Sequence, residues 1–182
     1  EEILRHHFAN GRMDSYALLV RYGDKKCILT SPNINPDTCF EVASLTKVTV
    51  TAPLALMAVR EGKLCLDERL GDIFPGLTDM AESTVFQLMT HSSGIGGVHF
   101  SFELTDQGSF EVAKAICQAP ANYQPGTAVE YSCMGVITLG AILEQRYGKK
   151  LDALFEEKLA KPLGLARSRF CMPLGEENTA IC

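Results

Sequence analysis

The fold is decided around residues 40–47, which read Phe40-Glu41-Val42-Ala43-Ser44-Leu45-Thr46-Lys47. This stretch begins the longest predicted helix, residues 45–61, which a glycine closes. Before it, residues 16–22 and 25–30 favour strands on either side of a glycine-containing turn, which predicts a β-hairpin. After it, the predicted elements are all helices. Strands therefore precede helices without alternating with them, which indicates an α+β fold and argues against a doubly wound sheet.

The other helices are predicted from apolar spacing and from helix-start and helix-stop residues. They cover residues 1–11, 84–90, 109–119, 132–147 and 151–159. Pro53 should kink the long helix because it removes a backbone hydrogen bond. Ser83 or Thr84 can cap the helix that follows them. Pro162 and Gly164 should end the last helix.

The length of 182 residues corresponds to one domain with a core of its own. A hairpin by itself is only marginally stable and needs further strands or helix cover. Two strands cannot cover so many helices. We therefore expect the pairing partners of this hairpin to lie outside the chain.

The composition excludes several classes of protein. Apolar residues make up 46% and charged residues 21%, which rules out a disordered chain, a coiled coil and a collagen-like repeat. The net charge is −5 and no basic cluster is present, so no nucleic-acid partner is expected. The longest apolar run, residues 48–59, is too short to span a bilayer. No signal peptide opens the sequence, although its first residue is Glu1, so a removed signal remains an alternative.

Seven cysteines are scattered along the chain, with no Cys-x-x-Cys pair. No zinc site or other metal site is therefore expected. The simplest interpretation is that these thiols are reduced, buried, small hydrophobic residues in a reducing compartment, which favours a cytoplasmic location. A disulfide framework is the alternative.

Ser44 and Lys47 form a Ser-x-x-Lys motif at the start of the long helix. Residues at positions i and i+3 of a helix face the same way, so the amine can reach the hydroxyl. A serine hydroxyl needs such a neighbour to become a nucleophile, and partial burial can lower the pKa of a lysine enough for it to act as a base. The structural alternative is a helix-capping serine followed by a surface lysine.

Two further candidates lie downstream. Tyr131 precedes the helix 132–147, and a phenol beside an ammonium group has a lowered pKa and can move a proton. A tyrosine packed at a helix start is the alternative. His91 lies beside two serines, but neighbours on a tight loop rarely orient as a catalytic triad. We expect His91 to make structural hydrogen bonds that hold its loop.

Together these motifs resemble serine β-lactamases of class C and their relatives, the D-Ala-D-Ala carboxypeptidases, penicillin-binding proteins and carboxylesterases. The motifs, in chain order, are Ser44-x-x-Lys47, Leu88-Met89-Thr90-His91-Ser92-Ser93-Gly94 and Pro125-Gly126-Thr127…Tyr131-Ser132. Smaller matches agree with them: Glu61-Gly62-Lys63-Leu64-x-Leu66-Asp67, Leu139-Gly140-x-Ile142-x-Glu144 and Lys161-Pro162-Leu163-Gly164-Leu165. The resemblance extends from about Phe8 to Leu165.

The resemblance implies a β-lactamase/transpeptidase-like fold, in which a helical lobe packs beside an antiparallel sheet. Residues 1–182 would form a single such domain that holds only the first hairpin of the sheet and lacks the C-terminal strands and the final helix. The implied catalytic residues are Ser44 as nucleophile, Lys47 as the group that helps remove its proton, and Tyr131 as the group that protonates the leaving group. The backbone N–H of Ser44 would be one oxyanion donor. No cofactor is implied.

Two departures from the family pattern matter. Cys133 stands where the family usually has a substrate-contacting asparagine, and a thiol replaces an amide poorly. Cys133 is thus a candidate substrate-binding residue, and an alternative nucleophile if its environment lowers its pKa. In addition, the family's third motif, a Lys- or His-led triplet that ends in glycine, does not occur in the sequence.

The leading hypothesis is the N-terminal part of a serine hydrolase that forms an acyl-enzyme with an amide, a β-lactam or an ester. Its partners would be a small-molecule or peptide-like acyl donor and a missing C-terminal segment of the same protein. The alternative is a non-catalytic scaffold of the same fold that binds a peptide-like ligand or a partner subunit. Cys133 and the missing triplet favour that alternative, whereas the retained Ser44, Lys47 and Tyr131 oppose it.

Overall fold

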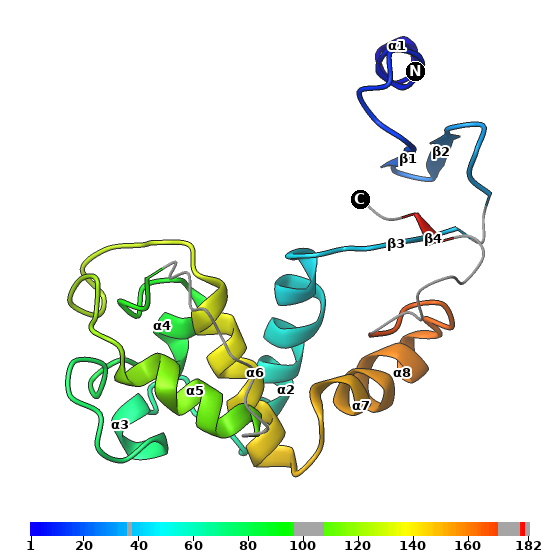
Figure 1. Ribbon diagram of the computed structural model, residues 1–182. Coiled ribbons are helices and arrows are strands. Elements are labelled where there is room, and N and C mark those ends of the chain that lie inside the picture. The colour runs from blue at the N-terminus through cyan, green and yellow to red at the C-terminus, as the bar shows by residue number, and fades with distance from the viewer. Residues whose placement is uncertain (36–37, 97–107, 171–178, 181–182) are drawn as a thin grey trace. The chain divides into compact units, whose positions relative to one another are not determined.

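The computed structural model describes residues 1–35, 38–96, 108–170 and 179–180 (Figure 1). The chain divides into two compact units. The hairpin unit comprises residues 1–43 and 170–182, and the helical unit comprises residues 44–169.

The hairpin unit confirms the predicted N-terminal helix and β-hairpin. Helix α1 spans Glu2–Ala9, and strands β1 (Ala17–Tyr22) and β2 (Lys25–Thr30) pair antiparallel across a tight turn. A second sheet, which the sequence did not predict, pairs β3 (Cys39–Phe40) with β4 (Thr179–Ala180) in parallel. Strands of two residues show no hydrophobic period, so no pattern in the sequence could reveal them.

The helical unit is built around α6, which spans Cys133–Tyr147 (Figure 1). Helix α6 contacts α2, α4, α5, α7 and the π-helical turn η1. The other elements of this unit are η1 (Lys47–Thr51), α2 (Ala52–Arg60), α3 (Leu70–Ile73), α4 (Val85–Met89), α5 (Ser109–Gln118), α7 (Leu151–Phe155), η2 (Glu156–Ala160) and α8 (Lys161–Leu163). The structure confirms the predicted helices and adds α3, which is only four residues long.

Local chemistry explains where two of these helices begin and end. Thr84, rather than Ser83, caps α4: its hydroxyl accepts from the N–H of Gln87, and the Gln87 amide oxygen accepts from the N–H of Thr84. Ser132 caps α6 by accepting from the N–H of Met134. Gly148 ends α6 in the left-handed conformation, as its position predicts.

The prolines inside helices each follow a π-helical turn. The N–H of Ala52 donates to the carbonyl of Lys47, and a second five-residue π turn, η2, lies before Pro162. A proline ring crowds the carbonyl four residues earlier, and the wider π turn relieves that crowding. The prediction that Pro162 helps to end the last helix is therefore wrong. The helix continues through α8, and Gly164, at φ +67°, ends it.

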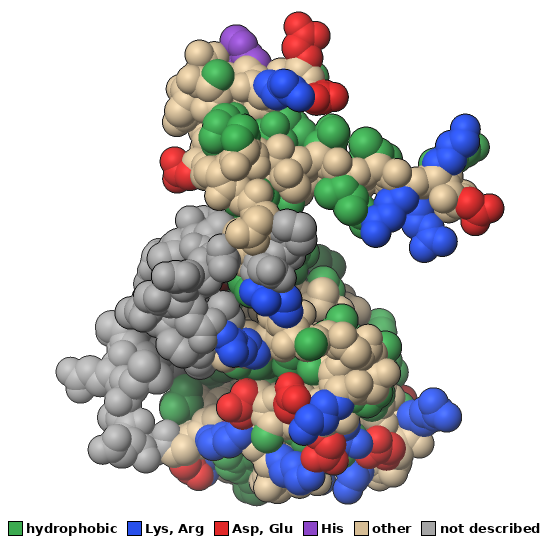
Figure 2. Space-filling view, turned by 90° about the vertical axis from the view of Figure 1, so that its right-hand side faces the viewer, with side chains coloured by type: hydrophobic (Ala, Val, Ile, Leu, Met, Phe, Trp, Pro, Cys, Tyr) green, Lys and Arg blue, Asp and Glu red, His purple; other side chains and the backbone are tan. Residues whose placement is uncertain are grey.

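Among the described residues, all buried hydrophobic side chains lie in the helical unit, between Val50 and Ala160. In the hairpin unit, Leu19, Val20 and Ile28 are at least half exposed. Figure 2 shows hydrophobic side chains along the hairpin, and acidic and basic side chains intermingled on the visible face of the helical unit. No helix of the described part of the chain is long and apolar enough to cross a membrane.

The expectation that the cysteines are buried is wrong for three of them. Cys27, Cys65 and Cys133 are exposed free thiols, whereas Cys117 is buried. Burial raises the pKa of the Cys117 thiol to about 12, which makes it unreactive. These exposed thiols lie outside the core: Cys27 is in β2, Cys65 is in the connection between α2 and α3, and Cys133 is the first residue of α6.

Candidate functional site

Ser44 and Lys47 meet at the start of the long helix, as the Ser-x-x-Lys spacing predicts. The Lys47 Nζ donates to the Ser44 Oγ over 3.0 Å. Ala43, immediately before Ser44, has φ +41°, a left-handed conformation that an alanine rarely adopts. Strained backbone of this kind concentrates at functional sites, where the surrounding structure holds it in place.

Tyr131 lies at the end of a loop, residues 121–132, which is tied to the loop that contains His91. The N–H of Glu130 donates to the carbonyl of His91 over 2.9 Å, and the N–H of Asn122 donates to the carbonyl of Gly94 over 3.0 Å. The Ser132 hydroxyl donates to the carbonyl of Gly96 over 3.0 Å. These bonds fix the backbone on both sides of Tyr131.

Glycine is required where the two loops touch. Gly94 has φ +89°, and a Cβ on it would lie 2.5 Å from the carbonyl oxygen of Tyr123. A Cβ on Gly96 would lie 2.0 Å from the side-chain amide of Asn122. Real Cβ atoms cannot approach so closely, so the Gly-rich segment after His91 lets the loops come together.

His91 makes the structural hydrogen bonds that its loop position predicted, and it also contacts Tyr131. Its Nδ1 accepts from the N–H of Ser132 over 3.2 Å, and its carbonyl accepts from the Tyr123 hydroxyl over 3.0 Å. Its ring packs on the Tyr131 ring with 4.7 Å between centroids. His91 therefore positions the tyrosine, a role that the sequence did not reveal because it depends on loops 40 residues apart in the chain.

The Lys47 amine lies 5.2 Å from the centroid of the Tyr131 ring, so the hydroxyl, the amine and the phenol occupy one site. Hydrogen bonds from Lys47 and Ser44 lower the pKa of the Tyr131 phenol below its usual value of 10.0. Tyr131 and Cys133 are both exposed. The helical unit thus brings together four predicted site residues from two segments far apart in sequence: Ser44 and Lys47, and Tyr131 and Cys133.

The net shift of the Lys47 pKa is opposite to the lowering that this lysine would need to act as a base. Burial does push this pKa down, but hydrogen bonds with Tyr131 and Cys133 push it up, and the balance raises it above the usual value of 10.5. Lys47 is therefore an ammonium ion at neutral pH. Such an ion stabilises negative charge on neighbouring oxygen atoms but does not itself accept a proton.

The pKa of His91 is lowered below 6.5, because its ring is partly buried and Lys47 is nearby, although its hydrogen bond with Ser132 opposes this. A neutral imidazole fits its contacts, since Nδ1 must be unprotonated to accept from Ser132. Within the described residues, no group of three or more His, Cys, Asp or Glu side chains could hold a metal ion. The groups that meet here suit nucleophilic and proton-transfer chemistry.

Comparison with known proteins identifies the family. The family model described as "Beta-lactamase" matches residues 1–178. Penicillin-binding protein 4 of Amycolatopsis lactamdurans is 33% identical over 156 residues, which cover 81% of this chain and 39% of that protein. Esterase EstB of Burkholderia gladioli is 32% identical over 149 residues, which cover 71% of this chain and 38% of that protein. The chain thus spans about two fifths of the length of these relatives.

Solved structures confirm the predicted β-lactamase/transpeptidase-like α+β fold. The crystal structure of a class C beta lactamase superposes with a TM-score of 0.83 at 22% identity, and covers 98% of this chain and 52% of that one. The crystal structure of SurE with D-Leu superposes with a TM-score of 0.76 at 27% identity, and covers 90% of this chain and 39% of that one. The chain belongs to the beta-lactamase family.

Proposed function

We propose that the protein is a serine hydrolase that cleaves an ester, an amide or a β-lactam through an acyl-enzyme on Ser44. One observation carries the proposal: the Lys47 amine donates to the Ser44 hydroxyl over 3.0 Å and at the same time lies 5.2 Å from the centroid of the Tyr131 ring. Relatives named penicillin-binding protein, esterase and D-alanyl-D-alanine carboxypeptidase support this range of substrates.

In the first half-reaction, the Tyr131 phenolate takes the proton of Ser44 while the serine oxygen attacks the substrate carbonyl. The lowered pKa of Tyr131 makes the phenolate accessible, and the Lys47 ammonium stabilises both oxygens. The backbone N–H of Ser44 is the proposed oxyanion donor. When the tetrahedral intermediate collapses, the bond to the leaving group breaks, and Tyr131 returns the proton to that group.

In the second half-reaction, water attacks the ester formed on Ser44. Tyr131 accepts a proton from the water and returns it to the Ser44 oxygen as the carbon–oxygen bond breaks. The products are a carboxylic acid and the free serine. In this mechanism Tyr131 is the proton carrier and Lys47 is the permanent positive charge, because only the tyrosine has a pKa moved toward neutrality.

A second candidate function is a non-catalytic scaffold that binds a peptide-like ligand. Cys133 favours it, because a thiol offers weaker hydrogen bonds to a substrate amide than the asparagine usual in the family. The two candidates differ in a simple property. A hydrolase turns substrate over in a way that depends on Ser44, whereas a binding scaffold does not.

The test uses the natural full-length protein with three substrates: p-nitrophenyl butyrate, a chromogenic cephalosporin and a D-alanyl-D-alanine peptide. The proposal predicts turnover of at least one of them and a fall in kcat/KM of at least about 10³-fold in Ser44→Ala. Ser168→Ala, which removes an exposed serine of the helical unit, is the matched control. Equal activity in Ser44→Ala and the control would contradict catalysis by Ser44, and a lack of turnover with all three substrates would favour the non-catalytic scaffold.

A further inference from the structure

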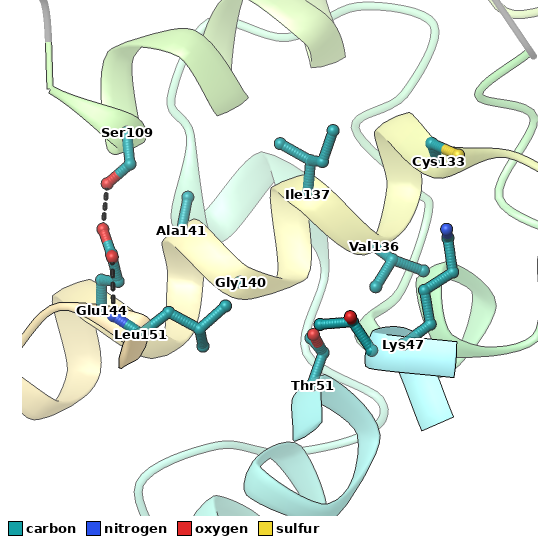
Figure 3. Close-up of a pocket in the computed structure, with 11 residues that line it drawn as sticks. Lys47, Thr51, Ser109, Cys133, Val136, Ile137, Gly140, Ala141, Glu144 and Leu151 are labelled. Atoms are coloured by element: carbon teal, nitrogen blue, oxygen red, sulfur yellow. Dashed lines mark hydrogen bonds between the residues drawn. The ribbon is translucent and has the colours of Figure 1, made fainter. Parts of the chain in front are cut away.

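A cavity of about 420 Å³ runs along α6 and reaches Lys47, the hydrogen-bond partner of the proposed nucleophile Ser44 (Figure 3). Its volume lies in the range of small-molecule sites, about 300–1,000 Å³. Lys47 and Cys133 line one end, and Ser109, Glu144 and Leu151 line the other. From Cys133 to Glu144 the helix rises by about 16 Å, so the cavity is elongated.

The walls between these two ends are largely apolar, although Thr46 and Thr51 also line the cavity. Val136, Ile137 and Ala141 of α6 line the cavity together with Gly140. Gly140 leaves room for it, since a Cβ there would meet only Leu151, at 3.5 Å. A larger side chain at Gly140 would therefore project into the cavity.

The polar groups at the far end are already satisfied. The Glu144 carboxylate accepts from the N–H of Leu151 over 2.8 Å and from the Ser109 hydroxyl. Lys150 forms an ion pair with the same carboxylate. The Glu144 carboxylate already has these partners, so it offers little to a charged or hydrogen-bonding group of a ligand. This end of the cavity therefore favours an apolar ligand.

The cavity lies on one side of the proposed reaction centre. Among the described residues, its lining includes Lys47 and Cys133 and does not include Tyr131. Since Tyr131 must reach the leaving group to protonate it, the leaving group lies on the tyrosine side. The acyl half of the substrate then points toward Cys133 and the apolar walls that follow it along α6.

We propose that this cavity binds the apolar acyl chain of a carboxylic ester, so that the preferred substrates are medium-chain esters. This inference rests on the proposed function of Ser44. The Ser44 oxygen forms a bond to the acyl carbon and the alcohol leaves with the proton from Tyr131. Water then releases the medium-chain acid. Each methylene buried in the cavity raises kcat/KM about fourfold, which corresponds to ~0.8 kcal/mol.

The test compares p-nitrophenyl octanoate with p-nitrophenyl butyrate in the natural full-length protein. The measured quantity is the ratio of their kcat/KM values, which does not depend on the fraction of active protein. Four more methylenes at about fourfold each give a ratio of about 250 when all of them are fully buried, and we expect a ratio of at least about 10 in the wild type. Gly140→Leu should lower the ratio at least about tenfold. Gln145→Leu, which adds the same side chain to an exposed position of α6, should leave it unchanged.

Gly140→Ala fills less of the cavity, and its Cβ would meet only Leu151, at an ordinary contact distance. It should lower the octanoate-to-butyrate ratio by a smaller factor than Gly140→Leu does. A wild-type preference for butyrate, or an equal ratio in the wild type and both Gly140 variants, would overturn the acyl-chain site while leaving Ser44 catalysis intact. Ester hydrolysis as fast in Ser44→Ala as in the wild type would overturn the proposed function itself. The two failures are therefore distinguishable.

Discussion

The helical unit and the hairpin unit differ in how their side chains are held. In the helical unit, α6 buries nearly every residue from Gly135 to Leu143 against its neighbours. Strands β1 and β2 of the hairpin unit have no buried residue. All four candidate site residues belong to the helical unit, whose first residue is Ser44. Reactive groups on an exposed helix end are thus positioned by a well-packed helix body and by hydrogen-bonded loops.

The largest expected effect is on catalysis, in Tyr131→Phe. This change removes the phenol but keeps the ring that packs on His91. We expect kcat/KM to fall about 10²–10⁴-fold, the usual contribution of a proton-transfer group. Tyr22→Phe, at an exposed tyrosine of the hairpin unit, is the matched control and should have no effect.

The pH dependence of kcat/KM in the wild type and in Tyr131→Phe shows whether the phenolate is the reactive form of Tyr131. The phenol of Tyr131 has a lowered pKa and the ammonium of Lys47 a raised one, so a phenolate and an ammonium coexist between the two. The kcat/KM of the wild type should rise as the pH increases through the pKa of Tyr131, and fall above the pKa of Lys47. In Tyr131→Phe the rising limb should disappear. An unchanged profile would remove Tyr131 from the mechanism.

The second effect contrasts the stability of the two units. Leu143 is fully buried in α6, whereas Leu19 in β1 is 59% exposed. Leu143→Ala should lower the free energy of unfolding by about 2–5 kcal/mol, because it leaves a cavity, and Leu19→Ala by less than about 1 kcal/mol. Urea unfolding of residues 1–182 measures both values. Equal losses would contradict the contrast between the units.

A smaller effect is expected at His91. Asparagine readily adopts the φ of +57° found at position 91, and its side chain keeps a hydrogen-bond acceptor. His91→Asn therefore removes mainly the ring that packs on Tyr131. The kcat/KM should fall roughly tenfold, because the phenol is less well positioned. Asn10→Ala, at the exposed end of α1, is a control from the other unit.

Stability should also respond to pH at His91. The folded pKa is below 6.5, so the unfolded chain binds this proton more readily, and stability falls as the pH drops through 6.5 toward the folded value. The wild type should therefore lose more unfolding free energy over this interval than His91→Asn does. Parallel curves for the two proteins would mean that His91 does not titrate in the way described.

Much of the fold could be predicted because its signals are local. The turn between β1 and β2, the threonine that caps α4 and the glycine that ends α6 each act within a few residues. The strands β3 and β4 are too short to have a period, and the π turns before Pro53 and Pro162 depend on a hydrogen-bond shift that no residue pattern reveals.

The candidate site was predictable only in part. The spacing of Ser44 and Lys47 placed their contact on one helix face, since residues three apart are neighbours. The direction in which the pKa of Lys47 shifts was not predictable. It depends on the balance between burial, which lowers this pKa, and hydrogen bonds to residues more than 80 positions away, which raise it. The ring contact of His91 with Tyr131 likewise depends on tertiary structure.

The most direct test of the account is covalent labelling of the natural full-length protein with a fluorophosphonate, followed by peptide mass spectrometry. Such a reagent phosphonylates an activated serine oxygen and displaces fluoride. We expect one adduct, on Ser44, that forms at least about 10²-fold more slowly in Tyr131→Phe. An adduct on another residue, or labelling of Ser44 at the same rate in both proteins, would contradict a nucleophile activated by Lys47 and Tyr131.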